Sequence, residues 1–225
     1  NDKINTPVHI YSSGSASLDN VTITGGIFGI RVHTCKNVTL NDVEIRNAAS
    51  HGIFMQNSPT VKVTGQLKIV NAGSRGIQVN SGIFDGSNAD KIEIIDPSSV
   101  GIENGGTVTT NNSEVYGNSG THGAFVGVSA SGSYGTKVDC VNTKLHNNYA
   151  STGGALCYLQ DNSGIGYVKL TGCTVENNCS PLGLFYSYAY FVPTWIKDTT
   201  FDNNACSVYE FGSDNRGFSV AGNTQ

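Results

Sequence analysis

The sequence has few charged residues, no long apolar run and no closely paired cysteines. Only 13% of its 225 residues are charged, and the formal net charge is −4. We therefore expect no nucleic-acid partner, because phosphate groups are bound by clustered lysine and arginine. No apolar run approaches the roughly 18 residues of a membrane-spanning helix, so no transmembrane segment is expected. The absence of Cys-x-x-Cys pairs argues against a zinc ribbon.

A glycine followed by a small or branched apolar residue recurs along the chain. The occurrences are Gly29-Ile30, Gly52-Ile53, Gly76-Ile77, Gly101-Ile102, Gly123-Ala124, Gly154-Ala155 and Gly183-Leu184. An amide or acid lies five residues before five of these glycines: Asn47, Asn71, Asp96, Asn118 and Asn178. Asn148 lies six residues before Gly154. A period of roughly 20 to 50 residues is typical of a solenoid.

Apolar and polar residues alternate between these glycines, as in Val38-Thr-Leu40 and Val43-Glu-Ile45. Such alternation predicts short β-strands with one buried face. Parallel strands normally need a crossover helix. No stretch has helical periodicity, so only a coil that stacks on itself fits both facts. The sequence predicts an all-β fold, a single-stranded parallel β-helix (solenoid) of about eight rungs.

We expect residues 1–225 to form one such β-helix domain. A solenoid needs its ends covered, and neither terminus has an obvious cap. The chain is therefore expected to be a segment of a longer protein.

Two inward columns and one polar column follow from aligning the repeats by their glycines. The first inward column is Ile45, Ile69, Ile94, Val115, Leu145, Val175 and Phe201. The second is Ile30, Ile53, Ile77, Ile102, Ala124, Ala155 and Leu184. The polar column is expected to form a structural amide ladder of Asn47, Asn71, Asp96, Asn118, Asn148 and Asn178, which fixes the register of the coils.

Stacked strands lie about 4.8 Å apart, a spacing that a disulfide can bridge. Five of the six cysteines lie in the second half of the chain, on neighbouring repeats. We predict a disulfide between Cys179 and Cys206, which follow Asn178 and Asn204 closely. Free buried thiols that pack as small apolar residues are the alternative.

The repeat, as in Asn37-Val-Thr-Leu40 and Gly52-Ile-Phe-Met55, resembles that of the right-handed parallel β-helix (pectin lyase-like) superfamily, which includes pectin and alginate lyases. The right hand of the coil is implied by this resemblance. A local stretch, from Leu145-His-Asn-Asn148 to Gly153-Gly-Ala155-Leu, resembles the F-x-x-N and G-G-A-I repeats of chlamydial polymorphic outer-membrane adhesins. Together they imply an extracellular or cell-surface location.

A uronate lyase of the superfamily needs a cation for the sugar carboxylate and a base for the C5 proton. The candidates around the recurring glycine are Arg31, His51, Arg75 and His122, with Glu103 beside them. Phe54, Phe125, Leu156 and Phe185 are expected in the same outward column. Solvated side chains beside turns are the alternative interpretation.

His146, Glu176 and Asp202 fall on three consecutive rungs, and such a set can hold a divalent metal. It is equally compatible with a solvated edge, so no metal site and no cofactor are predicted. The column Glu44, Lys68, Glu93 alternates in sign and is interpreted as a structural charge ladder.

Aromatic residues gather in the segment 184–195. Phe185, Tyr186, Tyr188, Tyr190 and Trp195 are candidate ligand-binding residues, because such a patch can stack on sugar rings or meet another chain. A hydrophobic cover for the last rungs is the alternative.

Several catalytic signatures of the superfamily are absent, including the polygalacturonase-like and mannuronan-epimerase motifs. We therefore favour a non-catalytic extracellular β-helix of a surface adhesin, coat or fibre protein. Its expected partner is a polysaccharide or cell-surface glycan, or another protein chain. A polysaccharide lyase, epimerase or hydrolase that acts on a carboxylated glycan is the alternative.

Overall fold

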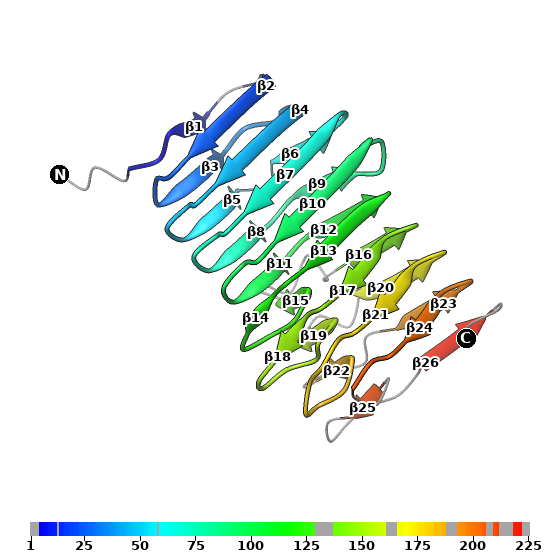
Figure 1. The fold of residues 1–225 in the computed structure, drawn as a ribbon. Helices are drawn as coiled ribbons and strands as arrows, with labels where there is room; N and C mark the ends of the chain where they lie inside the picture. Colours follow the sequence, from blue (N-terminus) through cyan, green and yellow to red (C-terminus); the bar gives the residue numbers. More distant parts are fainter. Residues whose placement is uncertain are drawn as a thin grey trace.

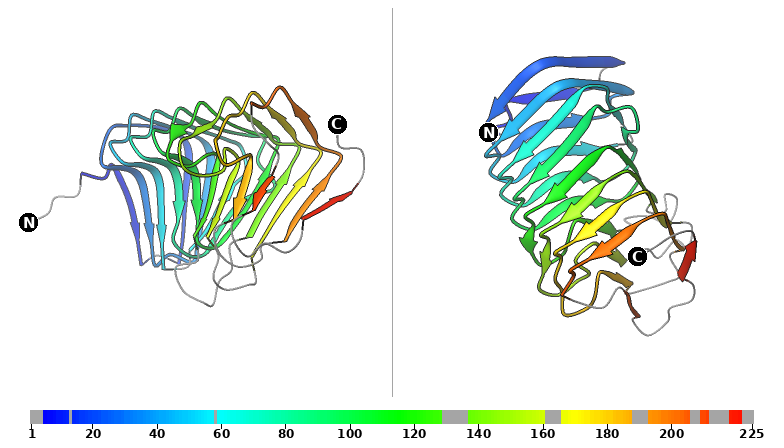
Figure 2. Two further views of the ribbon diagram at one scale, coloured as in Figure 1. Left: turned by 90° about the horizontal axis from the view of Figure 1, so that it is seen from below. Right: turned by 45° about the vertical axis from the view of Figure 1, so that its right-hand side comes forward.

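The computed structural model describes residues 5–12, 14–57, 59–128, 137–160, 166–187, 193–205, 209–211 and 218–221. Every regular element in these ranges is a β-strand (Figure 1). The strands follow a coil that winds along one axis, with the first strands (blue) and the last strands (orange and red) at opposite ends of the stack (Figure 2). Within the described residues, no helix is long and apolar enough to cross a membrane.

One side of the coil, here called face A, is a sheet of nine parallel strands in the described part of the chain. In order of stacking they are β1 (Val8–Tyr11), β3 (Phe28–His33), β5 (His51–Gln56), β8 (Arg75–Val79), β11 (Val100–Asn104), β15 (Phe125–Val128), β19 (Cys157–Gln160), β22 (Phe185–Ser187) and β25 (Tyr209–Phe211). Each strand pairs in parallel with those of the preceding and following coils. The predicted parallel β-helix is therefore confirmed.

The other two sides, faces B and C, are continuous in the first coils and separate later. β2 (Ser15–Thr24) and β4 (Asn37–Arg46) each run across both faces. Face B continues with β6 (Thr60–Val63), β9 (Ile83–Gly86), β12 (Thr107–Asn111), β16 (Lys137–Val141), β20 (Tyr167–Thr171), β23 (Thr194–Lys197) and β26 (Phe218–Ala221). Face C continues with β7 (Gln66–Val70), β10 (Lys91–Ile95), β13 (Ser113–Tyr116), β17 (Lys144–His146), β21 (Thr174–Glu176) and β24 (Thr200–Asp202).

The coil turns sharply where single residues adopt the left-handed backbone conformation. Between faces C and A these residues are Gly25, Asn47, Asn71, Asp96, Gly117, Asn147, Asn177 and Asn203. Asparagine, aspartate and glycine tolerate a positive φ better than other residues. This requirement explains why these residue types recur with the period of the coil.

The first predicted inward column is confirmed. Ile45, Ile69, Ile94, Val115, Leu145 and Val175 are register partners on successive coils of face C, and each is at most 1% exposed. Phe201 continues the column and is partly buried. Burying one such side chain stabilises the fold by about 1.5–3 kcal/mol.

The second predicted column is correct over its first four members and shifts afterwards. Ile102 pairs with Phe125 and not with Ala124, and the column continues through Cys157 and Phe185. The cause is a longer turn: residues 117–124 replace the short turn 47–50. The longer turn adds a small sheet in which β14 (Ser119–Gly120) pairs with β18 (Tyr149–Ala150). The expectation that Phe125, Leu156 and Phe185 point outward is wrong, since all three are fully buried.

The predicted amide ladder is two columns that lie one residue apart. Asn47, Asn71 and Asp96 are exposed corner residues with positive φ. Asn118, Asn148 and Asn178 occupy the next position, which points inward, and they are at most 1% exposed. The same inward position holds Ala48, Ala72 and Pro97 in the earlier coils. The buried ladder therefore exists only in the C-terminal half of the described coils.

Candidate functional site

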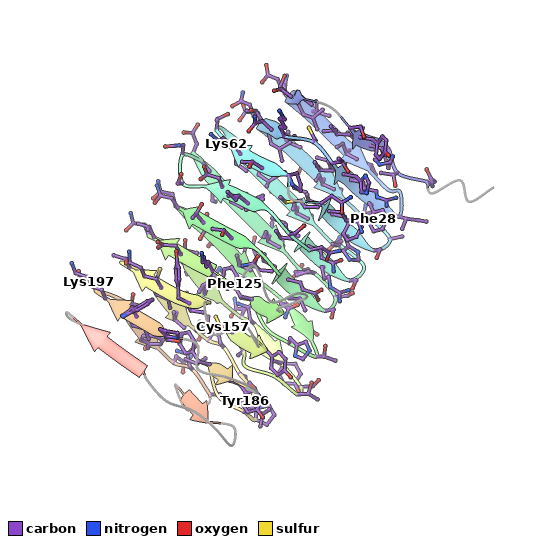
Figure 3. The ribbon with its side chains drawn as sticks, turned by 180° about the vertical axis from the view of Figure 1, so that it is seen from behind. Phe28, Lys62, Phe125, Cys157, Tyr186 and Lys197 are labelled. Atoms are coloured by element: carbon purple, nitrogen blue, oxygen red, sulfur yellow. The ribbon has the colours of Figure 1, made fainter. Side chains whose placement is uncertain are left out.

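The outer surface of face A carries a row of polar and aromatic side chains along the axis of the coil. The register of the strands aligns Arg31, Phe54, Gln78 and Glu103, and beyond β15 the same register leads to Tyr158 and Tyr186. Phe28 and Tyr186 lie toward opposite ends of this face, whereas Lys62 and Lys197 lie along another edge of the stack (Figure 3). We call this row the face A strip.

A chain of hydrogen bonds links the middle of the strip. Arg75 Nε donates to Glu103 Oε2 at 2.6 Å, and Gln78 Nε2 donates to Glu103 Oε1 at 2.8 Å. His51 Nε2 contacts Gln78 Oε1, and Ser50 Oγ lies 2.6 Å from His51 Nδ1. Each side chain in this chain of contacts therefore has a partner from a neighbouring coil or residue.

The acceptor-only carboxylate of Glu103 sets the direction of these bonds. Because Glu103 can only accept, the Gln78 amide donates through Nε2 and offers Oε1 to His51. His51 then carries its proton on Nε2, and its Nδ1 accepts from the Ser50 hydroxyl. Burial lowers the pKa of His51, and the hydrogen bond that His51 donates to Gln78 opposes this shift only in part. His51 is thus a neutral side chain with both ring nitrogens engaged.

At the N-terminal end of the strip, an aromatic cluster packs against the cationic side chain of Arg31. The rings of Phe28 and Phe54 are stacked with centroids 4.9 Å apart, and His51 meets both rings edge-on. The Arg31 guanidinium lies 5.9 Å and 5.8 Å from the centroids of the two phenylalanine rings. Its Nη2 donates to Gln56 Oε1 at 3.0 Å.

The C-terminal end of the strip is a stack of three rings. His122 lies 4.3 Å from the ring centroid of Tyr158, which in turn lies 5.7 Å from that of Tyr186. Burial lowers the pKa of His122, while Glu103 raises it and Arg75 lowers it further. His122 therefore lies within electrostatic range of Glu103 and Arg75, which belong to the hydrogen-bonded group in the middle of the strip.

The structure therefore brings the four candidate catalytic residues to one face. His51 and Arg75 are direct register partners, and His122 and Arg31 lie toward either end of the strip. Sequence reasoning missed Gln78 and Tyr158, because a glutamine or tyrosine in a strand is not distinctive by itself. Only the register places them between the charged residues.

The predicted aromatic patch does not form one surface. Phe185 is fully buried in the core, Tyr186 lies on face A, and Trp195 lies on face B. Trp195 is 44% exposed, and its ring lies 5.8 Å from that of Tyr167. Tyr188 and Tyr190 lie outside the described residues. Phe185 and Tyr186 are separated because neighbouring residues of a strand point to opposite sides of a sheet. Trp195 is separated from both because it belongs to β23, a strand of face B.

The row His146, Glu176, Asp202 has the predicted register but makes other contacts. His146 Nε2 lies 3.1 Å from Glu114 Oε1, and Glu176 pairs with Lys144 at 2.6 Å. The described part of the chain contains no group of three residues able to hold a metal ion.

The predicted charge ladder on face C is only partly an interaction between coils. Lys68 lies 3.8 Å from Glu93, but Glu44 pairs with Arg46 of its own strand at 2.6 Å. A shallow depression of about 420 Å³ lies beside this row, lined by Asn20, Thr22, Asp42, Val43, Glu44, Gln66 and Lys68. It is on face C, so it is separate from the face A strip.

The described cysteines are free thiols. Cys35, Cys140, Cys157 and Cys173 are buried, and Cys179 is half-buried. Burial raises the pKa of the Cys140, Cys157 and Cys173 thiols, so they are protonated and unreactive in the folded chain. Cys206 lies outside the described residues, and its disulfide with Cys179 stays a prediction.

Comparison with known families identifies the fold class directly. Residues 28–224 match the family described as "Right handed beta helix region". The chain belongs to this right-handed β-helix family. No curated protein and no solved structure matches it. Membership of this family shows that the β-helix is right-handed, but it assigns no ligand or reaction to the face A strip.

Proposed function

We propose that this β-helix is a non-catalytic extracellular or cell-surface protein that binds a glycan with the outer surface of face A. The face A strip is the observation that supports this role. It presents aromatic rings, planar amides and charged groups at the spacing of the strands, along the axis of the coil.

The chemistry of the strip suits a polysaccharide chain. Aromatic rings pack against the apolar faces of sugar rings, and fixed amide and charged groups orient the hydroxyls by hydrogen bonds. Tyr158 and Tyr186 are only partly buried, so their outer edges are accessible to a ligand. The adhesin-like stretch from Leu145 to Leu156 supports a location on the cell surface.

Two contacts favour binding over uronate cleavage. A catalytic base needs a free lone pair, but both nitrogens of His51 are engaged in the folded chain. A cation that neutralises a sugar carboxylate needs free charge, but Arg75 is paired with Glu103 at 2.6 Å. The lyase, epimerase or hydrolase alternative therefore takes second place.

Binding to a glycan array tests the proposal. The double substitution Tyr158→Ala with Tyr186→Ala is expected to weaken binding by about tenfold or more, because it removes the exposed rings without touching the core. Trp195→Ala is the matched control, since this exposed ring lies on face B. Its binding is expected to equal that of the unaltered chain.

Two outcomes contradict the proposal. One is loss of binding in the Trp195→Ala variant alone, which moves the site to face B. The other is formation of an unsaturated product from pectate or alginate that disappears in a His51→Ala variant, which makes face A catalytic.

A further inference from the structure

Arg31 differs from the other described arginines in its electrostatic surroundings. Arg46 and Arg75 each lie 2.6 Å from a carboxylate oxygen. Across the described ranges, Arg31 forms no ion pair, and its one hydrogen bond goes to the neutral amide of Gln56. The N-terminal end of the face A strip therefore carries an uncompensated positive charge.

The side chain of Arg31 is held in place even without a counter-charge. Phe28 and Phe54, which stack on each other, both pack against the guanidinium, and Gln56 accepts a hydrogen bond from one of its terminal nitrogens. Its Nε is buried and has no hydrogen-bond partner in the part of the chain described. A buried N–H without an acceptor is costly, by about 1–3 kcal/mol. Arg31 as a whole is only partly buried, so an anion can approach its side chain from solvent.

On the preceding coil, the strand beside Arg31 is β1, which contains no acidic residue. The register partner of Arg31 is His9, and Tyr11 and His33 stack with centroids 5.0 Å apart beside them. Burial lowers the pKa of His9, and the nearby Arg31 and His33 lower it further. An anionic ligand would meet no opposing carboxylate from these residues.

We propose that Arg31 is the anchor of an anion-binding subsite, which takes the carboxylate or sulfate group of an acidic polysaccharide lying along face A. The guanidinium offers a planar fork of N–H donors that matches these anions. Phe28 and Phe54 pack against it and keep it oriented. This inference rests on the proposed glycan-binding function and adds the charge class of the ligand.

Because the chain is negatively charged overall, an acidic polymer is expected to bind only at a local cationic site. The chain has a net charge of −4 and will repel polyanions in general. Retention of an acidic polymer therefore requires a local cationic site, and Arg31 is the cation of face A without an acidic partner in the described residues.

The test compares polymers that share one backbone: dextran, carboxymethyl dextran and dextran sulfate. Titration calorimetry at low salt is expected to detect binding of one or both charged polymers and at least about tenfold weaker binding of dextran. Arg31→Gln is expected to weaken binding of the charged polymer by about tenfold or more, and Arg31→Lys by less, because lysine keeps the charge but loses the fork. Arg46→Gln, on face C, is the matched control and is expected to bind as the unaltered chain does.

The carboxymethyl and sulfate arms distinguish which anion the subsite prefers. Equal binding of all three polymers, no binding of either charged polymer, or equal losses in Arg31→Gln and Arg46→Gln would each overturn the subsite. If the array detects neutral glycans that require Tyr158 and Tyr186 but not Arg31, the proposed function stands and the anion subsite fails.

Discussion

Gly52 shows at the scale of one residue why a glycine recurs in the early coils. A Cβ atom at this position would lie 2.5 Å from Ile69 Cγ2 and 2.6 Å from the carbonyl oxygen of Gly76. Gly76 and Gly101 are confined in the same way by the coils that follow them. The glycine is required by close approach of backbone and core, not by an unusual φ.

Substituting Gly52 by alanine is expected to destabilise the fold by about 1–3 kcal/mol, because the backbone of the next coil must move. Urea denaturation measures this as a lower midpoint with an unchanged slope. Gly14→Ala is the control, since nothing lies within 4 Å of its added methyl group. Equal stability of Gly52→Ala and the unaltered chain would contradict close packing at this corner.

At the scale of the structural element, the described turns between faces C and A differ along the axis: only the later ones contain buried asparagines that bond to one another. Asn148 Nδ2 donates to Val115 O at 3.1 Å and to Asn178 Oδ1 at 3.0 Å, and its Oδ1 accepts from Asn118 N at 3.3 Å. Asn178 repeats this pattern with Leu145 O and Asn204. The later turns are therefore joined by a continuous buried amide ladder.

The ladder begins at Asn118 for a physical reason. In each of its steps the backbone N–H of one coil donates to the amide oxygen of the next. The register that follows the Ile95–Tyr116 pair places Pro97 beside Asn118, and proline has no N–H to donate. Accordingly, Asn118 Oδ1 is buried without a partner in the described part of the chain.

Replacing Asn148 by alanine is expected to cost about 2–4 kcal/mol, because Val115 O and Asn118 N both lose a buried partner. Asn147→Gly is the matched control: this neighbour is exposed at a φ of 53°, which glycine adopts readily. Thermal and urea unfolding compare the two. A loss in Asn147→Gly as large as that in Asn148→Ala would mean that the turn, not the ladder, carries the stability.

At the scale of the whole molecule, the core residues of the first described coil are less buried than those of the coil that follows. Leu18 and Leu40 are register partners in one inward column, yet Leu40 is fully buried and Leu18 only partly. Val8 and Val21 of the first coil are also partly buried, whereas their partners Ile30 and Val43 are at most 2% exposed. In a solenoid each coil is covered only by its neighbours, so an end coil lacks half of its packing.

Two leucine substitutions in this column measure the difference. Leu40→Ala is expected to destabilise the fold by about 2–5 kcal/mol and Leu18→Ala by about 1 kcal/mol, because only the first leaves a closed cavity. Urea midpoints at constant slope provide the comparison. Equal losses would show that the first coil is covered as fully as the second.

Much of the fold could be predicted from the sequence because its determinants are local. The alternation around Ile45 and the left-handed conformation of Asn47 each depend on a few adjacent residues. The same reasoning failed at Phe125, Leu156 and Phe185, where a longer turn shifted the register. The candidate site was found in part: His51 and Arg75 were named correctly as neighbours, but Gln78, which joins His51 to Glu103, was not.

The repeat period and the alternation of apolar and polar residues are local properties, so they are sufficient to predict parallel β-rungs coiled around apolar columns. Which side chains share a face can be read only from the folded chain, because it depends on the length of every intervening turn. A change of one residue in register reverses the direction of each side chain in a strand. Tyr186 therefore lies on the candidate binding face, while its neighbour Phe185 is buried in the core.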